Sequence, residues 1–296
     1  MKKVLLSSVV ALALLGSGLQ AAEKKAADSK TVAAQAIQHA KSNALTAKGD
    51  VKIVKEAVEA VKLTQQVLIE LKQKKKDAAI KTLEKAIGKM EVVMSNPKAP
   101  ALIPLNASVV VSTFAGTAYD VQNAVITSIA LLQNHRVQDA RMIVQTLKDE
   151  IDLITINMPL ASYPAALKLA AKFLHENKID QARQVLATAL NTFVEVDMVT
   201  PLGILEAQDL ITAASQAAKT DKKLALAHLE AAKAELKKAE ALGYTSTSDT
   251  TYKMLNDEIN KIEKEIRGAN KSEGLFKELI EKLKDFADKA VKSIHK

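Results

Sequence analysis

Apolar residues recur along most of the chain with the spacing of an α-helix. The clearest stretch places Ala140, Ile143, Val144 and Leu147 at positions i, i+3, i+4 and i+7, which lie on one helix face. Three further stretches carry a similar pattern around an alanine. The four alanines, Ala79, Ala140, Ala182 and Ala225, are 61, 42 and 43 residues apart. This recurrence indicates an internal repeat with an insertion in its first interval.

Each repeat is predicted to be a hairpin of two helices. Residues 131–141 and 173–183 align at an offset of 42, and in both a short polar stretch separates two apolar helical patterns. A single hairpin cannot bury its apolar face alone. We therefore expect neighbouring hairpins to stack and to form the core together.

Runs of β-branched residues follow two of the hairpins and lead to a proline. Residues 151–156 precede Pro159, and residues 193–199 precede Pro201. Because the residue before a proline is kept out of the α region, these runs are predicted to be extended connectors or short strands. Residues 107–114 are a third candidate strand. The sequence thus predicts a mainly α fold, with stacked helical hairpins and short extended segments, and leaves the pairing of those segments open.

The residues after Gly243 predict two amphipathic helices. Gly243 is a good helix stop, the polar cluster 245–251 offers N-caps, and apolar residues then step by three and four within 255–266 and 276–294. Acid-first pairs at i and i+4 follow the final helix: Glu278–Lys282, Asp285–Lys289 and Asp288–Lys292. Such mixed charges favour packing on the body or self-association over a membrane surface, which remains the alternative.

The first residues have the pattern of a secretory signal peptide. Lys2 and Lys3 precede the apolar run 4–15, and small residues follow it. We expect cleavage after Ala21, or alternatively after Ala22, and a mature protein in the periplasm. The run is too short for a membrane-spanning helix, which needs about 20 apolar residues.

Composition narrows the function classes. The 296 residues contain no cysteine, which excludes disulfide scaffolds, Cys-ligated metal sites and cysteine nucleophiles. The net charge of +8 includes the two leader lysines, and the lysine-rich run 72–76 lies between two helical patterns. We interpret that run as a solvated turn between helices and expect no nucleic-acid partner.

The sequence contains no recognisable catalytic motif. It lacks G-x-S-x-G, H-E-x-x-H, Walker A and G-x-G-x-x-G, and its five histidines have no ligand spacing. Asp149, Glu150 and Asp152 form an acidic cluster at the end of a helical pattern, which we interpret as a solvated face. We therefore predict no enzyme activity, no catalytic residues, no cofactor and no metal.

One block of the chain resembles a known family. Residues 150–164, which read EIDLITINMPLASYP, are similar to the hallmark of the YfdX protein family. The elements 139–141 (DAR), 189–192 (ALNT), 200–202 (TPL) and 241–244 (ALGY) fit the family in the same order. The resemblance covers about residues 51–244 and extends through the helix to Ile266. Gly203 departs from it, where a second Pro-Leu pair would be expected.

The resemblance implies an exported, helix-rich stress protein without an established enzymatic activity. It suggests a helical-repeat domain over residues 50–266, after a signal peptide (1–21) and a polar, partly helical segment (22–49), and before a C-terminal amphipathic helix (267–296). Candidate binding residues lie in the Pro-bracketed block: Asn157, Met158, Pro159, Leu160, Tyr163 and Pro164. The favoured interpretation is that the block turns the chain between hairpins, and a ligand groove is the alternative.

Three hypotheses for the function remain. The leading one is a non-enzymatic, periplasmic, stress-associated protein that binds unfolded proteins or amphipathic small molecules on its helical repeats. The alternative is a structural or self-assembling envelope protein, a homo-oligomer that uses the C-terminal helix as its contact surface. A periplasmic hydrolase comes third, because a nucleophile–base motif is missing.

Overall fold

A computed structural model describes residues 27–244, 250–268 and 272–293 of the chain. The predicted signal peptide and both cleavage sites lie outside these residues. The described part contains eleven helices and one small sheet of three strands, which confirms the mainly α fold. The helices are α1 (Ser29–Asp50), α2 (Lys55–Lys72), α3 (Lys76–Met94), α4 (Ala118–Gln133), α5 (Val137–Val144), α6 (Tyr163–His175), α7 (Ile179–Leu190), α8 (Leu202–Ala217), α9 (Lys222–Ala241), α10 (Tyr252–Arg267) and α11 (Glu273–Ser293).

The three predicted extended segments are strands of one antiparallel sheet. β1 (Leu102–Ser112), β2 (Glu150–Pro159) and β3 (Val194–Pro201) lie in this order, with β2 in the centre. Ile103 pairs with Met158, and Ile151 pairs with Thr200. The strands therefore alternate with the helical hairpins along the chain.

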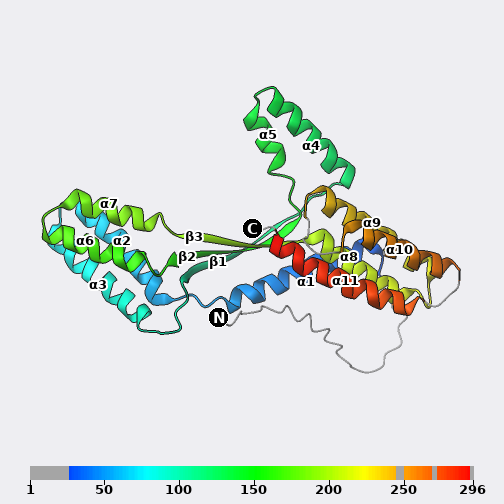
Figure 1. The fold of residues 1–296 in the computed structure, drawn as a ribbon, viewed down its shortest axis with the longest axis horizontal. Helices are drawn as coiled ribbons and strands as arrows, with labels where there is room; N and C mark the ends of the chain where they lie inside the picture. Colours follow the sequence, from blue (N-terminus) through cyan, green and yellow to red (C-terminus); the bar gives the residue numbers. More distant parts are fainter. Residues whose placement is uncertain (1–26, 245–249, 269–271, 294–296) are drawn as a thin grey trace.

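This alternation places consecutive hairpins at opposite ends of the sheet (Figure 1). The first and third hairpins, α2–α3 and α6–α7, pack together into one lobe. The fourth hairpin, α8–α9, forms the other lobe with α1, α10 and α11, and the second hairpin, α4–α5, projects from that end. Our expectation that neighbouring hairpins stack is wrong in this respect. Because each antiparallel strand carries the chain to the far end of the sheet, a hairpin can stack only with the next but one.

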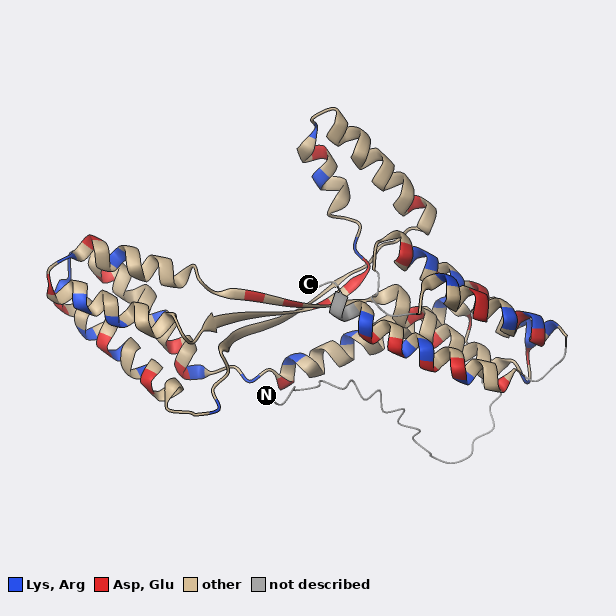
Figure 2. Ribbon diagram, viewed as in Figure 1, with Lys and Arg blue, Asp and Glu red and all other residues tan. Residues whose placement is uncertain are grey.

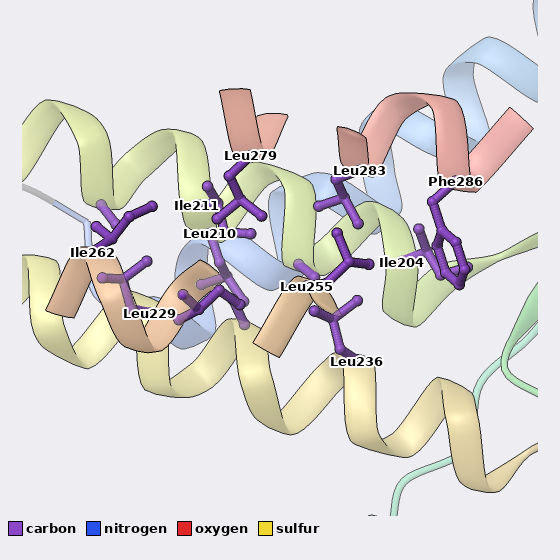
Figure 3. Packing of buried hydrophobic residues seen from close by; sticks show 14 of the residues in the cluster. Ile204, Leu210, Ile211, Leu229, Leu236, Leu255, Ile262, Leu279, Leu283 and Phe286 are labelled. Carbon is purple, nitrogen blue, oxygen red and sulfur yellow. The ribbon is translucent and has the colours of Figure 1, made fainter. Parts of the chain in front are cut away.

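The repeat itself is confirmed by the positions that are buried. All four repeat alanines, Ala79, Ala140, Ala182 and Ala225, lie in helix–helix contacts and are almost inaccessible to solvent. The core of the second lobe contains aliphatic side chains from α8 to α11 together with Phe286 (Figure 3), and Phe276 belongs to the same buried cluster. This interlocking explains how a chain without tryptophan or disulfides can hold a core.

Three hairpin turns have the same backbone geometry. Lys74, His135 and Asn177 occupy equivalent repeat positions, and each has a positive φ, between 57° and 61°. In each turn the following N–H bonds the carbonyl five residues earlier, as from Arg136 to Leu131 at 2.9 Å, which is a Schellman motif. The lysine run is a solvated turn of this kind. Gly243 ends α9 in the same way, with a φ of 85°.

Gly203, the residue that departs from the resemblance, has a packing role. It lies in the first turn of α8, where an added Cβ would be 2.9 Å from the backbone oxygen of Glu235 in α9. A larger residue would push the two helices apart, so the glycine sets how closely α8 and α9 approach.

The C-terminal helix packs on the body, as its charge pattern indicated. Its apolar side chains, including Leu279 and Leu283, are buried against α8 and α10. The pair Glu278–Lys282 forms at 2.8 Å, and Asp285–Lys289 forms at 2.9 Å. Among the described residues, no helix combines the length and the apolar character that crossing a membrane requires.

Candidate interaction surface

The second hairpin, α4–α5, is the part of the described structure with the most uncovered apolar surface. It stands away from both lobes, and its contacts with other helices are made mainly to α9 near its base (Figure 1). Charged residues are sparse on it compared with α9 to α11 (Figure 2). No Asp, Glu, Lys or Arg occurs between Val121 and His135. The exposed apolar side chains, which we call the hairpin surface, are Tyr119, Val125, Ile126, Ile129, Leu132, Val137, Met142 and Val144.

Comparison with the other hairpins shows that the residues of this surface occupy positions that are buried in the core elsewhere in the chain. Val125, Leu132 and Val144 are 39%, 49% and 51% exposed. Their repeat equivalents are all buried: Thr64, Leu167 and Leu210 for the first position, Leu71, Leu174 and Ala217 for the second, and Leu83, Leu186 and Leu229 for the third. The second hairpin has therefore kept core-type residues at positions that nothing in the described chain covers.

Two hydroxyls and the N-cap of α4 are satisfied locally. The hydroxyls of Thr127 and Ser128 donate to backbone oxygens one turn earlier, each at 2.8 Å. At the start of the helix, Thr117 and Asp120 form a reciprocal capping box. Beyond these groups the helix presents exposed apolar side chains such as Ile126 and Ile129, which is the character of a contact surface.

The base of the hairpin is fixed by a buried charged cluster. The carboxylate of Asp149 accepts from the backbone N–H of Phe114 at 3.1 Å, which joins the chain entering the hairpin to the chain leaving it. The backbone N–H of Asp149 donates to the Tyr244 hydroxyl at 2.9 Å, and that hydroxyl donates to Glu150 at 2.6 Å. Lys148 pairs with the other oxygen of Glu150 at 2.9 Å.

One lysine serves three carboxylates in this cluster. The Lys238 ammonium lies 2.9 Å from Asp149, 3.6 Å from Glu206 and 2.6 Å from Glu235. Burial alone would lower the pKa of Lys238, but these carboxylates hold it above its usual range. Burial and the neighbouring Glu235 raise the pKa of Glu206. These three carboxylates could together face a metal ion, yet the ammonium already supplies a cation there.

The interpretation of Asp149, Glu150 and Asp152 as a solvated face is wrong. All three are buried, because β2 is the central strand, α1 and α8 pack on it, and Lys238 of α9 covers Asp149 just before it. Burial, together with Glu150 and Asp197, raises the pKa of Asp152 to about 6. One carboxylate oxygen of Asp152 is buried without a hydrogen-bond partner among the described residues.

The Pro-bracketed block lies at the opposite end of the sheet, in the core of the first lobe. Met158 and Tyr163 are fully buried, and Pro164 is buried in the first turn of α6. The Tyr163 hydroxyl donates to Thr64 at 2.9 Å, and burial raises the pKa of Tyr163 to about 12. The Asn157 amide donates to the Val194 carbonyl at 3.3 Å.

The partly exposed members of the block, Pro159 and Leu160, border the sheet end. A shallow groove of about 340 Å³ lies near them between α6 and α7 and is lined by residues such as Ser162 and Thr188. Binding by the six predicted residues stays a prediction. In the structure, the block forms the turn that joins the end of β2 to the start of α6.

Sequence reasoning missed the hairpin surface because it treated all four repeats as equivalent. A signal was available, since α4 is apolar on more than one side and carries no charged residue after Asp120. A helix of that kind is either fully buried or a contact surface. Only the three-dimensional arrangement shows that no other described helix packs on the exposed apolar residues of this hairpin.

Comparison with known proteins identifies the central part of the chain. A family model described as YfdX protein matches residues 60–199. A solved structure of YfdX from Salmonella Typhi is 19% identical, with a TM-score of 0.36, and the match covers 52% of this chain and 95% of that one. No protein with curated annotation matches.

Proposed function

The chain belongs to the YfdX family through residues 60–199, and from this premise we propose that it is a chaperone-like binding protein of the periplasm. In this proposal it binds apolar segments of unfolded proteins on the hairpin surface and catalyses no reaction. The single observation that carries the proposal is the exposed apolar surface of α4–α5, which projects from the lobes and has no charged residue between Val121 and His135.

The physical basis is the burial of apolar surface. Each large apolar side chain that is removed from water contributes about 1.5–3 kcal/mol. An unfolded polypeptide exposes such side chains in no fixed order. An apolar surface without charged residues between Val121 and His135 can contact many different sequences of that kind. Ile126, Ile129 and Leu132 on α4, with Met142 on α5, offer this kind of contact.

The alternative of assembly through the C-terminal helix has less support. The apolar face of α11 is already buried inside the chain, so it does not offer a free contact surface. The groove beside the Pro-bracketed block would suit a small molecule, but its lining has no charged side chain to orient one.

The test is suppression of aggregation of a heat-denatured client protein. Ile129→Lys puts a charge on the hairpin surface, and Ile69→Lys on α2 is the matched control, since the two isoleucines are 50% and 49% exposed. We expect the wild-type protein and Ile69→Lys to suppress aggregation at a stoichiometric ratio, and Ile129→Lys to need a several-fold excess. Equal protection by both variants, or none by the wild type, would contradict the proposal.

The location is tested separately. We propose export with removal of the leader after Ala21 or Ala22. The N-terminal sequence and intact mass of the protein from a periplasmic extract check this, and a mass that still includes Met1 would overturn it.

A further inference from the structure

The hairpin surface also has the geometry of a self-docking site. In the first lobe, the equivalents of Leu132 and Val144 from the first hairpin, Leu71 and Leu83, share one core with those from the third hairpin, Leu174 and Leu186. The equivalent of Val125 in the first hairpin, Thr64, is buried there as well and accepts from Tyr163. That pairing is reciprocal: α3 of the first hairpin contacts α6 of the third, and α2 of the first contacts α7 of the third. In each contact, the first helix of one hairpin packs on the second helix of the other.

A reciprocal arrangement of this kind is a local pseudo-twofold. Applied to two identical hairpins, it becomes a true twofold, in which the same patch on each copy meets the other. The second hairpin is the repeat that has kept the core residues without a partner in the described chain, and the first lobe shows how such a face is covered.

We propose that α4–α5 docks onto α4–α5 of a second copy of this chain, with α4 of each copy against α5 of the other. The inference rests on the same surface as the proposed function, and it implies that a client and the second copy compete for it. Val125, Leu132 and Val144 would be buried in the interface, like their equivalents in the first lobe.

Electrostatics permits this self-contact. Like charges that meet across a twofold axis would oppose association, but no Asp, Glu, Lys or Arg occurs between Val121 and His135. Arg136 pairs with Asp139 at 2.7 Å at the tip, so these opposite charges compensate each other within the turn. Arg141 is the one further charged residue of α5. The other hairpins carry more charge on their outward faces, as Figure 2 shows for α9.

The experiment measures the mass of the purified protein by light scattering and sedimentation over a wide concentration range. We expect a dimer for the wild type and for Ile69→Lys, and a monomer for Leu132→Lys and for Val144→Lys. Circular dichroism and melting establish that the variants are folded. A monomeric wild type at every concentration, or dimers of both folded hairpin variants, would overturn the inference.

A second measurement does not depend on disrupting the fold. Because the chain has no cysteine, single substitutions give defined cross-links. Leu132→Cys mixed with Val144→Cys should form a disulfide between copies under mild oxidation, while Ile69→Cys should not. Cross-linking in the control alone, or in neither case, contradicts the proposed contact. A protein that forms the dimer but does not suppress aggregation would contradict the proposed function and leave this inference standing. A monomer that suppresses aggregation would overturn this inference and leave the proposed function standing.

Discussion

Replacing Asp152 by asparagine should make the protein more stable at alkaline pH and have little effect in acid. The carboxyl lies on the central strand between Val110 and Val199, and it is buried with one oxygen unpartnered among the described residues. Burial, Glu150 and Asp197 raise its pKa from 3.8 to about 6, although Lys148 partly offsets them. The folded protein therefore holds this proton over a range in which the unfolded chain has lost it.

The sign and size of the effect follow from proton linkage. Between pH 3.8 and about 6 the folded state binds more protons at this site, so the free energy of unfolding falls as the pH rises through that range. A shift of this size corresponds to about 3 kcal/mol at pH 8. Since an asparagine amide must also be buried there, we expect Asp152→Asn to gain about 1–3 kcal/mol at pH 8 relative to its effect at pH 3.5.

Urea denaturation of both proteins from pH 3.5 to pH 8.5, followed by circular dichroism, measures this difference. The matched control is Asp180→Asn in α7, where the side chain is 96% exposed. Its effect should be small and nearly independent of pH. A difference between the wild type and Asp152→Asn that stays constant with pH, or that falls with rising pH, would refute the reasoning.

Four further substitutions test other features by denaturation. Gly203→Ala should cost about 1–3 kcal/mol, because its Cβ would meet the Glu235 backbone; an unchanged midpoint would contradict this. His135→Gly should gain about 0.5–1 kcal/mol by relieving a positive φ, and a loss would count against it. Lys238→Met should cost about 3–5 kcal/mol at pH 7 and less in acid, where its carboxylate partners are protonated. Tyr163→Phe should cost about 1 kcal/mol with client binding unchanged; altered binding would instead support a ligand role for the block.

Much of the local structure could be predicted from the sequence. The i, i+3, i+4 and i+7 spacing identified the hairpins, and β-branched runs before proline identified β2 and β3. Thr251 caps α10 and Gly243 ends α9, as their residue types indicated. These features depend on contacts within a few residues, which a pattern along the chain can represent.

The arrangement of the hairpins could not be predicted in the same way. Their separation by the sheet depends on antiparallel pairing between distant strands, such as Ile151 with Thr200. The burial of Asp149 depends on Lys238 and Tyr244, which lie far along the chain. Charge alone favoured a solvated face, because the partner that makes burial possible belongs to another element.

The alternating layout also governs the order in which the molecule can fold. The first hairpin is complete once residue 94 has been made, but its cover, α6–α7, comprises residues 163–190. During synthesis from the N-terminus, the apolar face of α2–α3 therefore stays exposed to solvent while β1, the second hairpin and β2 are made. Because β1 pairs with β2, which is made only after the second hairpin, contact between the first hairpin and the adjacent second one is a natural trap until β2 has been made.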